Sequence, residues 1–420
     1  MSLRQIQLSS ILILLAMLLV APTIGFAQTN TTVCQTTVAQ AVTQIGVNCA
    51  NRTLGTACYG FPVIESNLDG SIDPATFDAI GEYVPLADVI HLRPQAIDTR
   101  NQTWGITVLN MQASLPSGLT DNVVVIGLGG LEIENGVASD NVFTPLAQPV
   151  SVTTTAAGEL REVTMSPLSA NVIGQVPSGA AVSADALSQD GNWIRIIYQG
   201  QPGWLAKSAF GTNAVQGIPT LDGLIAMQSF YTRTGIAGIG GNPCAIAPST
   251  VVVQGPRNAP VDVIINNVNI RIESTIVVRT LQGGEPIGRQ MEIIVLSGAA
   301  IIMPDSGERI IVPAGYKILV NLGPDLLSLG IEGDADERSV VSFAQPTLLT
   351  QQEIDALSIL ERIPRNILNY IIDLPEILTP SGTTRIITRI IFNDPQALAK
   401  VREFCASGEL PTAICQIFGL

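Results

Sequence analysis

Histidine, lysine and charged side chains in general are scarce in this sequence. Its 420 residues include one histidine, His91, and three lysines, and only 13% are charged while 46% are hydrophobic. Serine or cysteine nucleophiles and most catalytic zinc sites depend on histidine. Neither a GxSxG serine motif nor an HExxH zinc motif occurs. The sequence therefore argues against these hydrolase classes, and the apolar neighbours of His91 predict a buried or half-buried strand residue.

Positive charge is outnumbered, since 21 Lys and Arg stand against 35 Asp and Glu, a formal net charge of −14. An acidic, lysine-poor surface repels phosphate backbones and anionic lipid headgroups, so we expect neither nucleic-acid nor membrane-surface binding. Disorder is not expected, because disordered chains combine high charge with few apolar residues. The 26 prolines and 38 glycines indicate compact β modules joined by tight turns, and the length predicts about two to four domains.

Long apolar runs are confined to the start of the chain. Residues 11–20 form an apolar run preceded by Arg4, and small residues Gly25 and Ala27 stand before a plausible cleavage point. This layout predicts a signal peptide over residues 1–27 that is cleaved near Ala27. The run is shorter than the roughly 20 residues that cross a bilayer, although a retained anchor is the alternative. We therefore expect a secreted or envelope-located product without a transmembrane segment after cleavage.

Six cysteines also favour an oxidising compartment. The last two flank a Gly-Glu-Leu-Pro turn and are expected to pair with each other. The other four then have three connectivities, and one bond must join the N-terminal group to the isolated mid-chain cysteine. Metal ligation is the rival interpretation, but no CxxC pair occurs. The candidates are Cys34, Cys49, Cys58, Cys244, Cys405 and Cys415.

The N-terminal part combines a helical and a β pattern. Residues 33–47 have apolar side chains at helical spacing, which predicts a short helix held by cysteines. Residues 104–109, 122–128 and 131–134 are β-prone or alternate with period two. We therefore predict a disulfide-tied α/β region over residues 28–148.

From residue 149 to 212, turn dipeptides recur every eight to twelve residues, as in a small barrel. The run VIGQVPSGAAVSADALSQDGNWIRIIYQGQPGWLAKSAF resembles the bacterial SH3 (SH3b) domain. The matching positions are Gly174, Pro177, Gly179, Gly191, Asn192, Trp193, Gly203 and Trp204. The resemblance departs from the family at Thr164, which stands where the family has an arginine.

The SH3b resemblance implies recognition of a cell-wall or extracellular peptide, with peptidoglycan or an extracellular protein as the partner. Trp193, Tyr198 and Trp204 are the candidate groove-lining residues, because aromatic faces stack on sugars and peptide side chains. The alternative is that Trp193 fills the barrel core and Trp204 packs against the last strand.

Two further regions follow a connector, residues 213–249, that carries Cys244. Short β-branched strands predict a β sandwich over residues 250–345, and the segment EIIVLSGAAIIMPDSGERIIVPAGYKILVNL resembles a FecR-type domain. Residues 346–420 predict a helical C-terminal region, in which Thr350 and Glu353 form a capping box. The fold class is therefore mainly β and multi-domain: a small barrel and a sandwich, with a short N-terminal helix and a helical tail.

A wider resemblance covers the segments ACYG, TWGITVLNMQASLP, FYTRTG, NPCAIAP and VVVQGP. They are similar to those of a group of exported proteins of Chloroflexota-type bacteria that often carry SH3b modules. This resemblance implies export and a modular architecture, and no particular activity.

Acidic and glycine-rich clusters are the remaining candidates for chemical sites in the sequence. Glu132 with Glu134, or Asp334 with Asp336 and Glu337, could form a carboxylate pair, although a solvated strand face and an acidic loop are simpler interpretations. Asp334 with Asp336, or Asp69 with Asp73, offers oxygen ligands for Ca²⁺ but lacks EF-hand spacing. Residues 127–130 are glycine-rich without a following Lys-Ser/Thr, which favours a turn over a phosphate loop.

We therefore expect no metal, no cofactor and no enzymatic activity. The sequence predicts a secreted binding protein that acts through its SH3b-like module. A structural or assembly component of the envelope or of an extracellular filament is the first alternative, and oligomerisation is open. A carboxylate-based hydrolase is the second.

Overall fold

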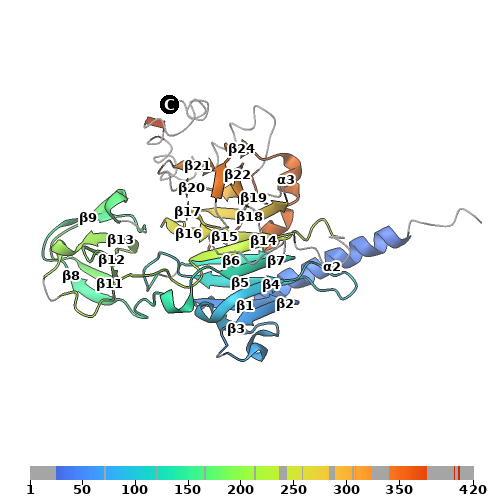
Figure 1. Cartoon of the computed structure of the whole chain (residues 1–420), viewed down its shortest axis with the longest axis horizontal. Coiled ribbons are helices and arrows are strands. Elements are labelled where there is room, and N and C mark those ends of the chain that lie inside the picture. The colour runs from blue at the N-terminus through green and yellow to red at the C-terminus, as the bar shows by residue number, and fades with distance from the viewer. Residues whose placement is uncertain are drawn as a thin grey trace, which may run out of the picture.

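The structure is a computed structural model. It describes residues 25–375, except 71, 120, 165–166, 212–213, 236–243, 258, 283–288, 305–306, 308 and 324–339, and also residues 402, 405 and 406. The side chains of residues 25–31 are not described. Within these ranges the chain is mainly β and forms three sheets, which confirms the predicted fold class (Figure 1).

Two large sheets pack face to face as a sandwich. The ten-stranded sheet has the order β23-β22-β19-β18-β15-β6-β5-β1-β3, with β24 also beside β22. Its strands are β1 (Thr56–Phe61), β3 (Tyr83–Pro85), β5 (Ile106–Met111), β6 (Val123–Leu128), β15 (Thr250–Gln254), β18 (Thr275–Gln282), β19 (Arg289–Ser297), β22 (Tyr316–Leu322), β23 (Val340–Phe343) and β24 (Thr347–Leu348). Side chains from both sheets form the main apolar core between them.

The eight-stranded sheet has the order β2-β4-β7-β14-β16-β17-β20-β21. Its strands are β2 (Ile64–Leu68), β4 (Val89–Pro94), β7 (Leu131–Asn135), β14 (Ser229–Thr234), β16 (Val261–Ile265), β17 (Val268–Ile272), β20 (Ala299–Met303) and β21 (Ile310–Pro313). Short 3₁₀ turns connect strands at Pro74–Phe77, Leu86–Asp88 and Ser139–Asn141.

Long hairpins bend across the sandwich and contribute strands to both sheets. In one of them β15 pairs with β18 in the first sheet, and β16 pairs with β17 in the second. Its tip is Asn266-Asn267, whose positive φ values of 49° and 62° are typical of the type I′ turn that matches strand twist. The same arrangement recurs for β19 with β22 and β20 with β21.

The predicted boundary between an N-terminal region, 28–148, and a sandwich, 250–345, is corrected by this pairing. Strand β6 pairs with β15 in the first sheet, and β7 pairs with β14 in the second. Both predicted regions thus belong to one sandwich. Alternation of apolar residues indicates which face of a strand is buried, but it does not say which distant strand lies beside it.

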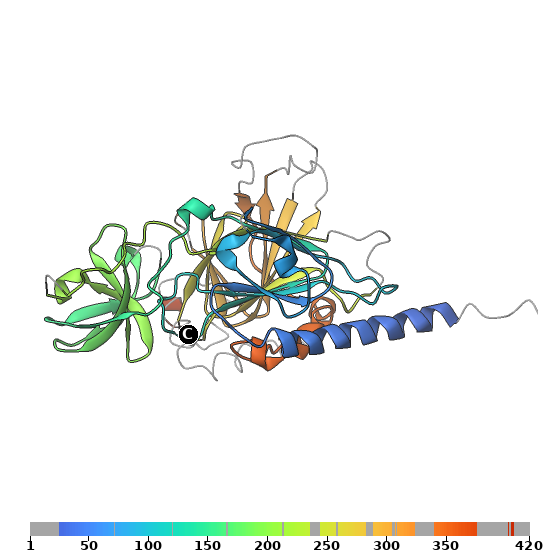
Figure 2. The same ribbon diagram turned by 90° about the horizontal axis from the view of Figure 1, so that it is seen from below.

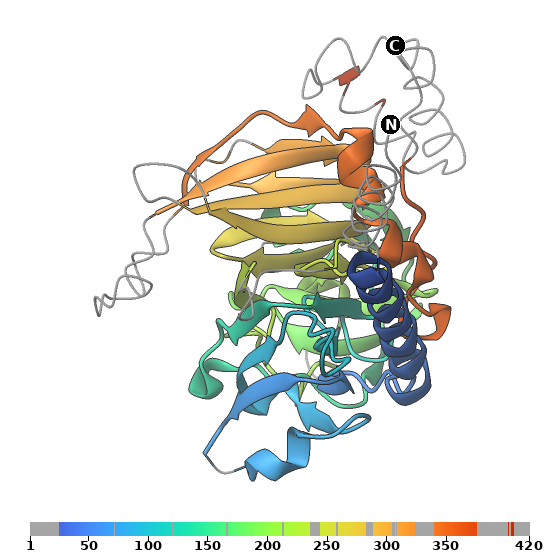
Figure 3. The same cartoon turned by 90° about the vertical axis from the view of Figure 1, so that its right-hand side faces the viewer.

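A helix and the C-terminal segment cover the outer face of the ten-stranded sheet (Figures 2 and 3). The helix, α2 (Gly25–Asn48), contains the predicted residues 33–47 and begins earlier. After β24 come α3 (Gln351–Asp355) and 3₁₀ turns at Ser358–Arg362 and Arg365–Ile367. The capping box at α3 is confirmed.

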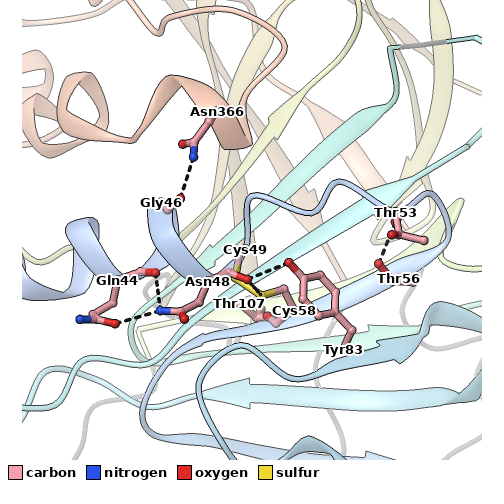
Figure 4. Close-up of a disulfide and its surroundings, with 10 residues drawn as sticks. All are labelled: Gln44, Gly46, Asn48, Cys49, Thr53, Thr56, Cys58, Tyr83, Thr107 and Asn366. Carbon is pink, nitrogen blue, oxygen red and sulfur yellow. Dashed lines mark hydrogen bonds between the residues drawn. A yellow bond between two sulfur atoms is a disulfide. The ribbon is translucent and has the colours of Figure 1, made fainter.

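Two disulfides hold α2. Cys34 bonds to Cys244, as expected for one link from the N-terminal group, and Cys49 bonds to Cys58 (Figure 4). The carbonyl of Asn48, at the end of α2, accepts a 2.8 Å hydrogen bond from the Tyr83 hydroxyl. Cys405 is also disulfide-bonded, while its predicted partner Cys415 lies outside the described residues.

Most of the predicted signal peptide, residues 1–27, lies outside the part of the chain that the structure describes. The predicted cleavage point after Ala27 falls within the first turn of α2, and residues 1–24 lie outside the described part. Disulfide bonding fits an extracytoplasmic location. In the described chain, no helix combines the length and apolar character needed to cross a membrane.

The third sheet is a separate six-stranded module inserted between β7 and β14 (Figure 1). Its order is β10-β9-β13-β12-β11-β8, from β8 (Val150–Thr153), β9 (Gly158–Arg161), β10 (Val172–Val176), β11 (Ala181–Leu187), β12 (Trp193–Tyr198) and β13 (Gln201–Ala206), with 3₁₀ turns at Pro167–Ser169 and Lys207–Ala209. The module encloses its own apolar core. Since β7 and β14 pair directly, it takes the place of a hairpin turn.

Candidate functional site: the inserted module and its joint with the sandwich

One row of side chains crosses the outer face of the module. Val172 lies opposite Arg161, Arg161 opposite Trp204, and Trp204 opposite Arg195. Directly opposed residues share a face of a sheet. The neighbours Ile194 and Ile196 point the other way, into the module core. The side chains of this row therefore point away from the module core.

Trp204 does not form an open groove. It is 1% exposed, and its indole Nε1 donates a 3.0 Å hydrogen bond to the carbonyl of Thr164. The backbone at Thr164, the position that departs from the SH3b pattern, therefore lies at the edge of this ring. The proposed ligand-binding role of Trp204 is corrected, because a fully covered ring cannot stack on a ligand.

Trp193 remains partly accessible. The guanidinium carbon of Arg161 lies 5.0 Å from the centroid of its ring, within cation–π range. Arg161 also donates to the carbonyl of Leu168 at 3.1 Å and to Glu159 at 3.3 Å. Leu168 is 70% exposed and Val172 is 49% exposed. We call Arg161, Leu168, Val172 and Trp193 the Trp193 surface.

Tyr198, the third predicted aromatic residue, lies at the opposite end of β12 from Trp193. Its ring packs against the module core, and its hydroxyl accepts a hydrogen bond from Gln199 at 3.2 Å. The structure therefore does not bring the three predicted aromatics together.

The covered half of the row forms a charged joint with the sandwich. Arg195 donates to both carboxylate oxygens of Asp185 at 2.9 and 2.8 Å, and both side chains are 0% exposed. Arg195 also donates to the carbonyl of Ser114, and the backbone N–H of Ser117 donates to Asp185 at 2.7 Å. The pairing of β11 and β12 shifts register between Ala184 and Ala186, so Asp185 lies in a bulge. These hydrogen bonds join Arg195 and Asp185 to each other and tie both residues to the sandwich.

A second charged contact lies on the sandwich side. Arg271 donates to Asp262 at 2.8 Å, and its guanidinium is 3.6 Å from Glu162 of the module. Burial alone would lower the pKa of Arg271, but the two carboxylates outweigh burial and raise it. Asn171 donates to Glu162 at 3.2 Å. The module is therefore attached at two charged points, which favours one orientation relative to the sandwich.

Glu132, one member of the predicted carboxylate pair, is held by two arginines. Arg93 and Arg233 each donate two hydrogen bonds to Glu132, one arginine on either oxygen. Burial would raise the pKa of Glu132, but the two arginines outweigh it and lower the pKa. A proton donor needs a raised pKa, so Glu132 does not suit general acid catalysis. Glu134 lies opposite His91, which is half-buried as expected.

The remaining candidates are structural or outside the described part. Asp73 caps a 3₁₀ turn by accepting from the Ala75 N–H at 3.0 Å. Gly129 has φ +72° in the turn between β6 and β7, in line with the expected turn. The described residues contain no group of three or more metal-ligating side chains. The acidic cluster at residues 334–337 lies outside them.

No family model, curated protein or solved structure matches this chain. The geometry of its own residues therefore carries the functional argument. The sequence had not singled out Asp185, Arg195, Glu162 or Arg271. The sequence signal for a buried Arg195 is weak, because Arg195 alternates with isoleucines and a strand residue that faces solvent shows the same alternation.

Proposed function

We propose that this chain is an exported, non-enzymatic binding protein that contacts cell-wall or extracellular ligands through the Trp193 surface of its inserted module. The observation that carries this proposal is the exposure of Leu168. At 70% it is the most exposed large hydrophobic side chain among the described residues, and it lies beside a stacked arginine–tryptophan pair.

Chemistry and placement both support this surface. Tryptophan and arginine are enriched at the energetic centres of interfaces, because they bury much area and offer directed contacts. An aromatic face with an adjacent guanidinium suits peptides and sugars of the cell wall. The charged joint on the covered half of the row leaves the Trp193 side free while fixing the module, which lowers the entropy lost on binding.

The absence of enzymatic activity is part of the proposal. His91 is the one histidine, and Glu132 is held as an anion by two arginines. An anionic Glu132 does not suit the role of a proton donor.

The test is co-sedimentation of the full chain with purified peptidoglycan. We expect Trp193→Ala to weaken binding roughly 30-fold, the equivalent of about 2 kcal/mol for an interface hot spot. Tyr231→Ala is the matched aromatic control on the sandwich and should bind like the unmodified chain. An unmodified chain that stays in the supernatant would exclude peptidoglycan as the ligand.

A photo-cross-linker at Leu168 on intact cells then tests for an extracellular protein partner. An adduct that disappears in Trp193→Ala supports the surface. A chain that neither sediments nor cross-links rejects the surface as a binding site.

A further inference from the structure

The segment after β24 lies on the sandwich in the manner of a bound peptide. We call residues 349–374 the arm. Its aliphatic side chains, among them Leu360, Ile367 and Leu368, are buried in the second apolar core, which also contains α2 and the outer face of the ten-stranded sheet. The arm therefore packs beside α2 and against the outer face of the ten-stranded sheet, and we call the surface that it covers the groove (Figure 3).

The floor of this groove binds the backbone of the arm. The amide oxygen of Gln254 accepts from the N–H of Asn369 at 2.8 Å, and its amide nitrogen donates to the carbonyl of Tyr370 at 3.1 Å. Arg52 donates to the carbonyl of Leu368 at 3.2 Å. Both backbone donors and backbone acceptors of the arm are thus matched, as in peptide recognition by an extended surface.

Side chains of the arm complete the contact. Asn369 donates to the carbonyl of Asn122 at 2.6 Å and accepts from Arg52. Asn366 donates to the carbonyl of Gly46 at 2.6 Å, near the end of α2 (Figure 4). A Cβ on Gly46 would lie 2.7 Å from the ring of Pro364, so this glycine allows the arm its close approach. The groove therefore has polar and steric features that select this segment.

These contacts do not depend on which copy of the chain supplies the arm. We propose that the groove is a peptide-binding site that takes the arm of a second copy, so that copies can join by arm exchange. An arm that leaves its own groove exposes several large aliphatic side chains, and the surface matched to them is the groove of another copy. The tether at β24 favours the arm of the same chain at low concentration, because it sets a high effective concentration. This inference uses a different face from the Trp193 surface and does not rest on ligand binding there.

The test uses a full-length chain whose arm is weakened while its groove is unchanged. In the variant Leu368→Asp with Ile372→Asp, two buried arm positions are charged. A labelled synthetic peptide of residues 349–374 should bind this variant with one-to-one stoichiometry. Binding should be at least ~10-fold tighter than to the unmodified chain, whose groove is filled. The matched control is Ile371→Asp, since Ile371 is 49% exposed and should leave the arm in place.

Adding Gln254→Ala to the weakened variant should reduce peptide binding again, because it removes the backbone contacts. Equal binding to the unmodified and weakened chains, or no binding to a weakened chain that keeps its sandwich by hydrogen exchange, would overturn the proposal.

A second measurement uses only unmodified chains, so it tests the proposal even if the weakened variant does not fold. Tagged and untagged unmodified chains are mixed at increasing concentration, and mixed dimers are recovered through the tag. Mixed dimers that increase with concentration and are reduced by excess peptide support exchange. Their absence over the whole range overturns it.

Discussion

The buried pair of Arg195 and Asp185 offers the sharpest test of how the module is attached. Arg195→Met keeps a long side chain and removes the charge. The substitution deletes two hydrogen bonds to Asp185 and one to the carbonyl of Ser114. Asp185 then keeps the backbone N–H of Ser117 as a donor but loses its counter-charge.

The expected cost follows from burial. Both side chains are 0% exposed, so water does not replace the lost partner. Removing one member of a buried ion pair costs about 3–5 kcal/mol, because the other charge is left uncompensated. Replacing both members is much milder, since an apolar pair of similar volume is often neutral. Arg195→Met with Asp185→Leu should therefore recover most of the loss, to within about 1–2 kcal/mol of the unmodified chain.

Urea unfolding followed by tryptophan fluorescence measures these differences, and hydrogen exchange shows whether the module opens first. Glu159→Gln is the control, because Arg161 and Glu159 form a partly exposed pair that should contribute at most about 1 kcal/mol. A loss for Arg195→Met no larger than that of the control would refute the reasoning. So would a double variant that is no more stable than the single one.

Three further predictions concern the sandwich. Cys34→Ser removes the Cys34–Cys244 disulfide, which spans 210 residues, and should lower the free energy of unfolding by up to about 5 kcal/mol through loop entropy. This is about twice the loss expected for Cys58→Ser, which removes the Cys49–Cys58 disulfide of Figure 4 with its separation of 9 residues. A lower melting temperature for Cys58→Ser than for Cys34→Ser would contradict this. Burial raises the pKa of Glu353, but its contact with Lys317 and the capping box outweigh burial and lower the pKa from 4.5 to about 2. The stabilisation by Glu353 is therefore complete above pH about 4.5 and lost as pH falls towards about 2, and unfolding of Glu353→Gln should lack this dependence. Gly105→Ala should lower the melting temperature, because the new Cβ would lie 2.4 Å from the carbonyl oxygen of Val63. A melting temperature equal to that of the unmodified chain would show that this close backbone contact is absent.

Local patterns predicted much of the secondary structure. Apolar spacing placed a helix over residues 33–47, and Thr350 with Glu353 marked the start of α3. These features depend on side chains a few residues apart, so the local sequence contains the information. The link from the N-terminal cysteines to Cys244 also followed, because three of the four were local.

Long-range pairing was beyond these patterns. Strands β6 and β15 are adjacent in space although the whole inserted module lies between them in the chain. Any β-branched, alternating strand can pair with many others, and the choice is made by the packing of the whole core. The predicted separation of residues 28–148 from residues 250–345 was wrong for this reason.

The candidate site shows the same division. Motif resemblance pointed to the module and to Trp193, whereas burial separated a partly exposed Trp193 from a covered Trp204. It also turned Arg195 and Glu132 from apparent surface charges into paired, buried ones.

Composition and local order in the sequence were enough to determine an acidic, β-rich, disulfide-bonded chain with little capacity for histidine chemistry. Tertiary structure alone decided which strands pair, which aromatic ring reaches the surface and which charges meet. Those outcomes depend on contacts between residues far apart in the chain, and such contacts exist only once the core has formed.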